Sequence, residues 1–164
     1  MFELNFISQF FQIYNYLHTG VNIMYKKILL PTDGSGYAEQ EVERVSNLIA
    51  DDGEILILSV AGKLTSSAFQ SRKKVRKANE IMEKDAHKAV EKMEKLFDNS
   101  LNLRTIVKTG FAAEKIIETA EEENADLIVI SSSGKSGLHR FIIGSVAEEV
   151  LKNADIDVLL IHSK

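Results

Sequence analysis

The chain has 164 residues, of which 45% are hydrophobic and 27% charged, and its formal net charge at pH 7 is −4. These values are typical of one globular domain with its own core, and the negative charge gives no bulk attraction to nucleic acid. The absence of cysteine excludes disulfides, thiol catalysis and thiolate metal sites. The sequence contains no apolar run of about 18 residues or more, so we expect no membrane-spanning helix.

Residues 1–23 differ from the rest of the chain in composition. They contain half of its Phe and Tyr residues, and Glu3 is their only formal charge. Three interpretations stay open: an extension upstream of a true start at Met24, a helix packed on the domain or on a subunit partner, or a segment with weak membrane contact. We therefore divide the chain into an N-terminal extension, 1–23, and a domain, 24–164.

The first part of the domain alternates strand and helix patterns. Lys26–Leu30 is a short apolar run ended by Pro31, which predicts a buried strand. Turn-forming residues 32–36 then lead into an amphipathic helix that is expected to end at Asp51–Gly53. Ile55–Val60 predicts a second strand, and a βαβ unit of this kind has parallel strands.

The second part repeats the alternation. Residues 61–71 are small and polar and predict a flexible loop, and an apolar stripe from Val75 to Leu96 predicts a long helix from about Arg72 to Phe97. A further helix is expected after Thr109-Gly110, and a last one after Gly144-Ser145. The three remaining predicted strands are Leu101–Val107, Leu127–Ile130 and Val158–Ile161.

Five strands that alternate with helices predict an α/β fold, a single doubly wound sheet with helices on both faces. In such sheets, ligands bind beyond the carboxyl ends of the strands, at the point where the strand order reverses. Two segments rich in turn residues follow predicted strands, Pro31–Gly36 and Ser131–Ser145. They are the candidates for a binding crevice.

The second of these segments has features of a phosphate-binding loop. Gly134 would let the backbone approach a ligand closely, and Gly144-Ser145 open a helix whose N-terminal N–H groups suit an anion. Lys135 and Arg140 put positive charge in the same loop. Their side chains are candidates for phosphate contacts, with a solvent-facing position as the alternative.

This loop resembles the nucleotide loop of the universal stress protein family, whose pattern is Gly, two residues, Gly, nine residues, then Gly-Ser or Gly-Thr. Gly134 and Gly144-Ser145 fit the pattern, and Ser131 stands where the family has its first glycine. The opening Tyr25–Ser35 and the closing Asp157–Ile161 carry the resemblance as well. It implies a five-stranded parallel sheet with the strand order 3-2-1-4-5.

The resemblance also implies a pocket for adenosine nucleotides between the first and fourth strands. Asp33 would accept hydrogen bonds from ribose hydroxyls, with a helix N-cap as the alternative role. Asp33 is the one evident carboxylate of the crevice, so Mg²⁺ or Mn²⁺ would be held mainly by the nucleotide's phosphates. The candidate nucleotide-binding residues are Pro31, Thr32, Asp33, Val60, Ser131, Gly134, Gly144, Ser145 and Val146.

The function implied by the resemblance is that of a cytoplasmic, ATP-binding regulatory protein in the stress response. It would act as a nucleotide-dependent switch or partner-binding module, with at most weak ATP hydrolysis, because no general base with a water-positioning group is recognisable. Similar proteins dimerise through their last strand, and Val158–Ile161 would be an apolar edge strand that needs such pairing. The alternative is a nucleotide-free dimeric interaction protein, which the serine at position 131 favours.

Three other phosphate or nucleotide sites are disfavoured. Gly134-Lys135-Ser136 is not a Walker loop, because Val129 stands where that motif needs its first glycine. The segment Thr32–Gly36 matches the Ser-Gly-Gly-x-Asp-Ser loop of adenylating ATP-pyrophosphatases only vaguely. A phosphoacceptor receiver domain would need an acidic neighbour beside Asp33, and the sequence has none there.

Overall fold

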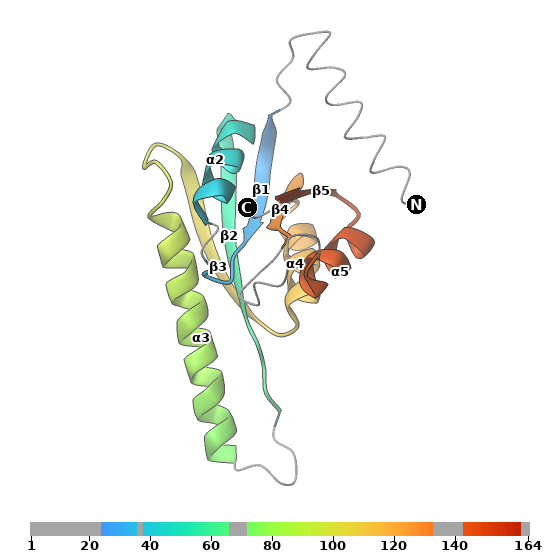
Figure 1. The fold of residues 1–164 in the computed structure, drawn as a ribbon. Helices are drawn as coiled ribbons and strands as arrows, with labels where there is room; N and C mark the ends of the chain where they lie inside the picture. The colour runs from blue at the N-terminus through green and yellow to red at the C-terminus, as the bar shows by residue number, and fades with distance from the viewer. Residues whose placement is uncertain (1–23, 36–37, 66–71, 133–142, 162–164) are drawn as a thin grey trace.

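A computed structural model of the chain describes residues 24–35, 38–65, 72–132 and 143–161, so the N-terminal extension lies outside the described residues. Its centre is a five-stranded sheet in the order β3-β2-β1-β4-β5, and all neighbouring strands are parallel (Figure 1). The predicted fold and strand order are thus confirmed. The strands are β1 (Tyr25–Pro31), β2 (Ile49–Ala61), β3 (Asn102–Thr109), β4 (Leu127–Ser131) and β5 (Asp157–Ile161).

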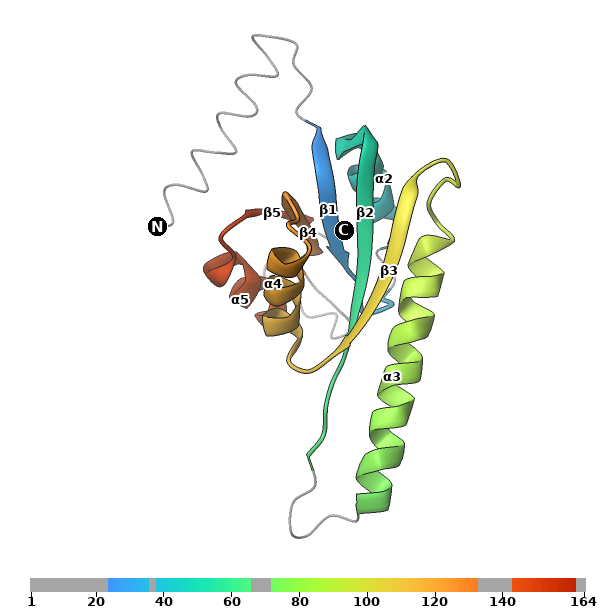
Figure 2. The same cartoon turned by 180° about the vertical axis from the view of Figure 1, so that it is seen from behind.

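Four helices among the described residues cover the two faces of the sheet. They are α2 (Ala38–Leu48), α3 (Arg72–Glu94), α4 (Ala112–Glu122) and α5 (Ser145–Asn153). Helices α2 and α3 pack on one face, and α4 and α5 on the other (Figure 2). None of these helices is long and apolar enough to span a membrane.

The central strands contain continuous apolar runs where helices cover both sides of the sheet. In β1, Ile28 and Leu30 pack toward α2 and α3, whereas Leu29 packs toward α4 and α5. All three side chains are fully buried, as are those of Ile55 to Leu58 in the neighbouring β2. This double burial fixes the sheet, and with it the positions of the loops at its carboxyl edge.

Two helices end earlier than the sequence pattern predicts. Helix α2 ends at Leu48, and β2 already begins at Ile49, with a shift of register against β1 before Glu54. Helix α3 ends at Glu94, after which Phe97 donates a 3.2 Å hydrogen bond to the carbonyl of Glu94 in a tighter turn. That turn buries Phe97 and leaves Leu96, which the predicted apolar stripe included, 39% exposed.

The segment expected to be a loop, 61–71, is only partly described. Ala61 still belongs to β2, and residues 66–71 lie outside the described part of the chain. Between them, Leu64 is tied to α3 through Asn79, whose side chain accepts from the Leu64 N–H at 2.9 Å and donates to its carbonyl at 3.0 Å. The described part of this segment is therefore anchored to the helix that follows.

Candidate functional site

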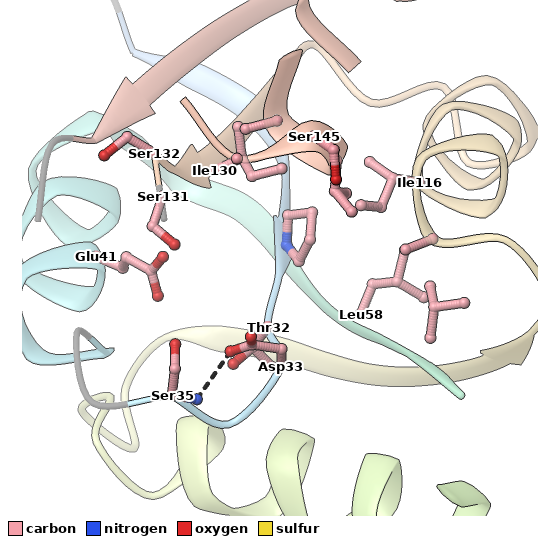
Figure 3. A pocket seen from close by; sticks show the side chains of 16 residues that line it. Thr32, Asp33, Ser35, Glu41, Leu58, Ile116, Ile130, Ser131, Ser132 and Ser145 are labelled. Atoms are coloured by element: carbon pink, nitrogen blue, oxygen red, sulfur yellow. Dashed lines mark hydrogen bonds between the residues drawn. The ribbon is translucent and has the colours of Figure 1, made fainter. Parts of the chain in front are cut away.

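A pocket of about 370 Å³ lies beyond the carboxyl ends of β1 and β4, where the strand order reverses (Figure 3). Small-molecule sites of α/β proteins are typically found at this point, and the volume is within their usual range. Three further predicted site residues, Gly134, Lys135 and Arg140, lie outside the described residues. The predicted site residues that line the pocket are Pro31, Thr32, Asp33, Val60, Ser131, Gly144, Ser145 and Val146.

The loop after β1 is held by one hydrogen bond to the neighbouring β2 and by one within the loop. The Thr32 N–H donates to the Leu58 carbonyl at 2.7 Å, and the Asp33 carboxylate accepts from the Ser35 N–H at 2.9 Å (Figure 3). Gly34 adopts a φ of 76°, which glycine tolerates far better than other residues. The contact from the Ser35 N–H makes Asp33 the first residue of an Asx turn.

The first turn of α5 forms a second wall. Gly144 is extended, with φ −63° and ψ 148°, and its N–H donates to the Ser132 carbonyl at 2.7 Å. The first hydrogen bond inside the helix is donated by Glu148 to the Gly144 carbonyl. The N–H groups of the three residues between them have no acceptor within the helix, and all three residues line the pocket. Together with the helix dipole, they suit an anion.

A third wall is apolar. It combines Leu58 and Val60 from β2 with Ile116 from α4 and Ile130 from β4, and Pro31 lies at the end of β1 beside them. Figure 3 places the Ile116 and Leu58 side chains on the side of the pocket opposite Glu41 and Ser131. A flat apolar group such as an aromatic base would be desolvated there at little cost.

Glu41, a second carboxyl group in the pocket, is not among the residues that the sequence pattern predicted for the site. Glu41 comes from α2, lines the pocket and is only 4% exposed. Its side chain faces Ser131 (Figure 3), whose hydroxyl is hydrogen bonded to it. Burial is the main cause that raises the pKa of Glu41 to about 7; the Ser131 hydrogen bond opposes this rise, and the Asp33 charge adds to it. The expectation that Asp33 is the one carboxylate of the crevice is therefore wrong.

The helical spacing contained a signal for Glu41, because it lies four residues before Val45, which is fully buried. Acidic residues in such a position are seldom buried without a basic partner, so helical spacing alone does not predict that Glu41 faces the pocket. Among the described residues, no group of three or more His, Cys, Asp or Glu side chains could hold a metal ion.

The geometry defines an α/β protein with a small-molecule pocket at the reversal of its strand order. Residues 24–162 match the model of the universal stress protein family, and the chain belongs to this family. The universal stress protein MJ0531 of Methanocaldococcus jannaschii is 32% identical over 147 residues, which cover 88% of this chain and 86% of that protein.

Solved structures agree with the family assignment. The structure of MJ0577, another universal stress protein of M. jannaschii, superposes with a TM-score of 0.69 and 32% identity, and the match covers 87% of this chain and 99% of the other. A family protein from Arabidopsis thaliana, solved with AMP bound, has the same fold at 19% identity and a TM-score of 0.54, covering 83% of this chain and 90% of that one.

Proposed function

We propose that this chain binds an adenosine nucleotide, with ATP as the physiological ligand, and acts as a nucleotide-dependent switch or partner-binding module. The observation that carries the proposal is the composition of the pocket walls. One wall is apolar, one bears hydroxyl and carboxyl groups, and one is the N-terminus of α5. A base, a ribose and a chain of phosphates need these three environments in one crevice.

The proposed roles follow from the chemistry of each wall. Val60 and Ile116 would pack against the base, and the Asp33 carboxylate would accept a hydrogen bond from a ribose hydroxyl. The N–H groups of Ser145 and Val146 would bind phosphate oxygens. Mg²⁺ would be held mainly by the phosphates, as it often is in nucleotide sites. The AMP bound to the Arabidopsis protein of the same fold supports a nucleotide as the ligand.

A nucleotide-free interaction protein is the second candidate, and one observation favours it. Ser131 occupies the position of the first loop glycine, and its hydroxyl is bonded to the buried carboxyl group of Glu41. An ionised carboxylate in the pocket would oppose an anionic ligand. The two candidates therefore differ in whether the pocket still binds a nucleotide with this carboxyl group present.

The first experiment asks whether the purified protein already contains a nucleotide. The full chain is purified without added nucleotide and denatured, and the supernatant is separated by anion exchange with detection at 260 nm. We expect a stoichiometric adenosine nucleotide, with ATP predominating. If the supernatant is empty and calorimetry with millimolar ATP and Mg²⁺ shows no binding, the nucleotide-free interaction protein is the better description.

A matched pair of variants tests the location of the site. Asp33→Ala removes the pocket carboxylate, whereas Asp51→Ala removes an exposed one at the far end of β1 and β2. We expect Asp33→Ala to weaken ATP binding about tenfold, the usual effect of losing one hydrogen bond to a charged group. Asp51→Ala should leave the affinity unchanged. Equal affinities of the two variants would mean that ATP does not bind in this pocket.

The proposal includes a homodimer formed through β5. In the sheet, β5 is an edge strand, and its Leu159 and Leu160 are only half-buried. Pairing with the same strand of a second copy would satisfy the open hydrogen-bonding edge. Sedimentation of the full chain should give the mass of a dimer, and a monomer at micromolar concentration would contradict this part of the proposal.

A further inference from the structure

Glu41 is the one charged side chain in the buried set of the described residues; the other polar members of that set are Ser59, Thr119 and Ser132. No ion pair within the described part of the chain involves its carboxylate, although nine ion pairs are formed there. Its one hydrogen-bond partner there is the Ser131 hydroxyl. A carboxyl group in this setting is costly to ionise.

The groups that face this carboxyl group do not neutralise it. Ser131 of β4 carries no charge, and Asp33, in the loop after β1, adds a second negative charge. On α2 itself, the neighbouring Glu43 and Arg44 are exposed. Lys135 and Arg140 belong to the part of the loop outside the described residues. Burial and Asp33 together raise the pKa of Glu41 to about 7, so its charge changes near neutral pH.

The Glu41 carboxyl group also lines the same pocket as the first turn of α5, the wall that suits an anion. Ser131 is followed directly by Ser132, whose carbonyl accepts from the Gly144 N–H at 2.7 Å at the start of α5. Ser131, Ser132 and Gly144 all line the same pocket as Glu41. A phosphate held by the first turn of α5 would thus share one partly enclosed space with the carboxylate, where like charges repel more strongly than in water.

We propose that Glu41 selects ligands by charge, because the pocket accepts an anionic ligand readily only while the Glu41 carboxyl group is protonated. The inference rests on the proposed nucleotide site and refines it. Binding of ATP would be coupled to uptake of a proton by Glu41, and binding of uncharged adenosine would not. The pocket would therefore favour more highly phosphorylated ligands at lower pH and lose this preference as the pH rises.

The experiment measures the dissociation constants of ATP and of adenosine by calorimetry from about pH 6 to about pH 8.5, in the presence of EDTA. For the wild-type chain, we expect the affinity for ATP relative to adenosine to fall about tenfold over this range, the effect of a shift of one pKa unit in Glu41 on binding. Deprotonation of ATP itself makes it a better ligand for N–H groups and would act in the opposite direction.

Glu41→Gln keeps the shape of the side chain and removes its titration. Relative to this variant, the wild type should bind ATP about equally at low pH and about tenfold more weakly at high pH. Glu43→Gln, an exposed change on the same helix that removes the same formal charge, should follow the wild type. If Glu41→Gln fails to fold, the inference is still tested by the pH dependence of the wild-type affinity for ATP relative to adenosine.

The outcomes separate this inference from the proposed function. If ATP binds but its affinity relative to adenosine stays constant or rises with pH, the inference is wrong and the nucleotide site stands. If Glu41→Gln binds ATP more weakly than the wild type at every pH, Glu41 contacts the ligand favourably, which also overturns the inference. If neither protein binds ATP at any pH, the proposed function fails, and the inference fails with it.

Discussion

The two helices that close the pocket present opposite electrostatic environments to it. Helix α5 contributes the N–H groups of its first turn, and its acidic residues Glu148 and Glu149 are exposed to solvent. Helix α2 instead directs the carboxyl group of Glu41 inward, where it is 4% exposed. One wall therefore attracts an anion and the other repels it at neutral to basic pH. The balance between them decides what the pocket binds.

The largest effect expected from this contrast is on stability. Folding raises the pKa of Glu41 from 4.5 to about 7, so between these pH values the folded chain holds a proton that the unfolded chain releases. The contribution of Glu41 to the free energy of unfolding is fully present below about pH 4.5 and is lost as the pH rises through about 7. The shift corresponds to about 3 kcal/mol in the free energy of unfolding.

Urea unfolding of the wild type and of Glu41→Gln tests this prediction. Between about pH 5 and about pH 8.5, the wild type should lose ~3 kcal/mol of unfolding free energy relative to the variant. Glu43→Gln is the matched control, because Glu43 is exposed on the same helix. A difference between wild type and Glu41→Gln that does not change with pH would show that Glu41 titrates normally.

A prediction of intermediate size concerns the other wall. Ser145→Pro removes an N–H donor at the first residue of α5, where proline is favoured, and the extended Gly144 before it, with ψ 148°, is compatible with a following proline. The helix should remain intact. ATP binding should weaken by about 2 kcal/mol, or about thirtyfold, because a hydrogen bond to a charged group is lost.

Two controls separate the N–H group from the other changes at this position. Ser145→Ala removes the hydroxyl but keeps the N–H, and it should bind ATP more tightly than Ser145→Pro. Adenosine, which has no phosphate, should bind equally to both variants. Loss of adenosine binding in Ser145→Pro would mean that the substitution has disturbed the pocket as a whole.

The wall formed by α5 could be predicted from the sequence, whereas the wall that contains Glu41 could not. The five strands followed from continuous apolar runs such as Leu127–Ile130, because double burial leaves a clear pattern. Their order followed only from the resemblance to the universal stress protein family. The start of α5 at Ser145 followed from Gly-Ser after a strand and a small-residue loop. These features are local in the sequence. They located the parts of the pocket formed by the loop after β1, by Ser131 at the end of β4 and by the first turn of α5.

Glu41 was missed because its burial depends on a contact between distant segments. Nothing near residue 41 in the sequence shows that α2 meets the end of β4, where Ser131 lies. The helix ends were also imprecise for a physical reason. Phe97 is buried by a tight turn after α3, and helical periodicity alone assigned that position on the apolar stripe to Leu96.

The smallest predicted effect tests the hydrogen bond between Ser131, at the end of β4, and Glu41 of α2. The Ser131 hydrogen bond lowers the pKa of Glu41, so Ser131→Ala should raise that pKa and leave more of the carboxyl group neutral at about pH 7.5. ATP affinity at that pH should increase about threefold, or ~0.7 kcal/mol. Alanine is preferable to glycine here, because glycine would also loosen the end of β4.

A double-mutant cycle makes this last prediction specific. In the Glu41→Gln background, Ser131→Ala should change ATP affinity little, since the group that responds to the hydroxyl is gone. If Ser131→Ala instead weakens binding equally in both backgrounds, the hydroxyl contacts the nucleotide directly. The serine at the position of the family's first glycine would then contact the ligand rather than regulate the pKa of Glu41.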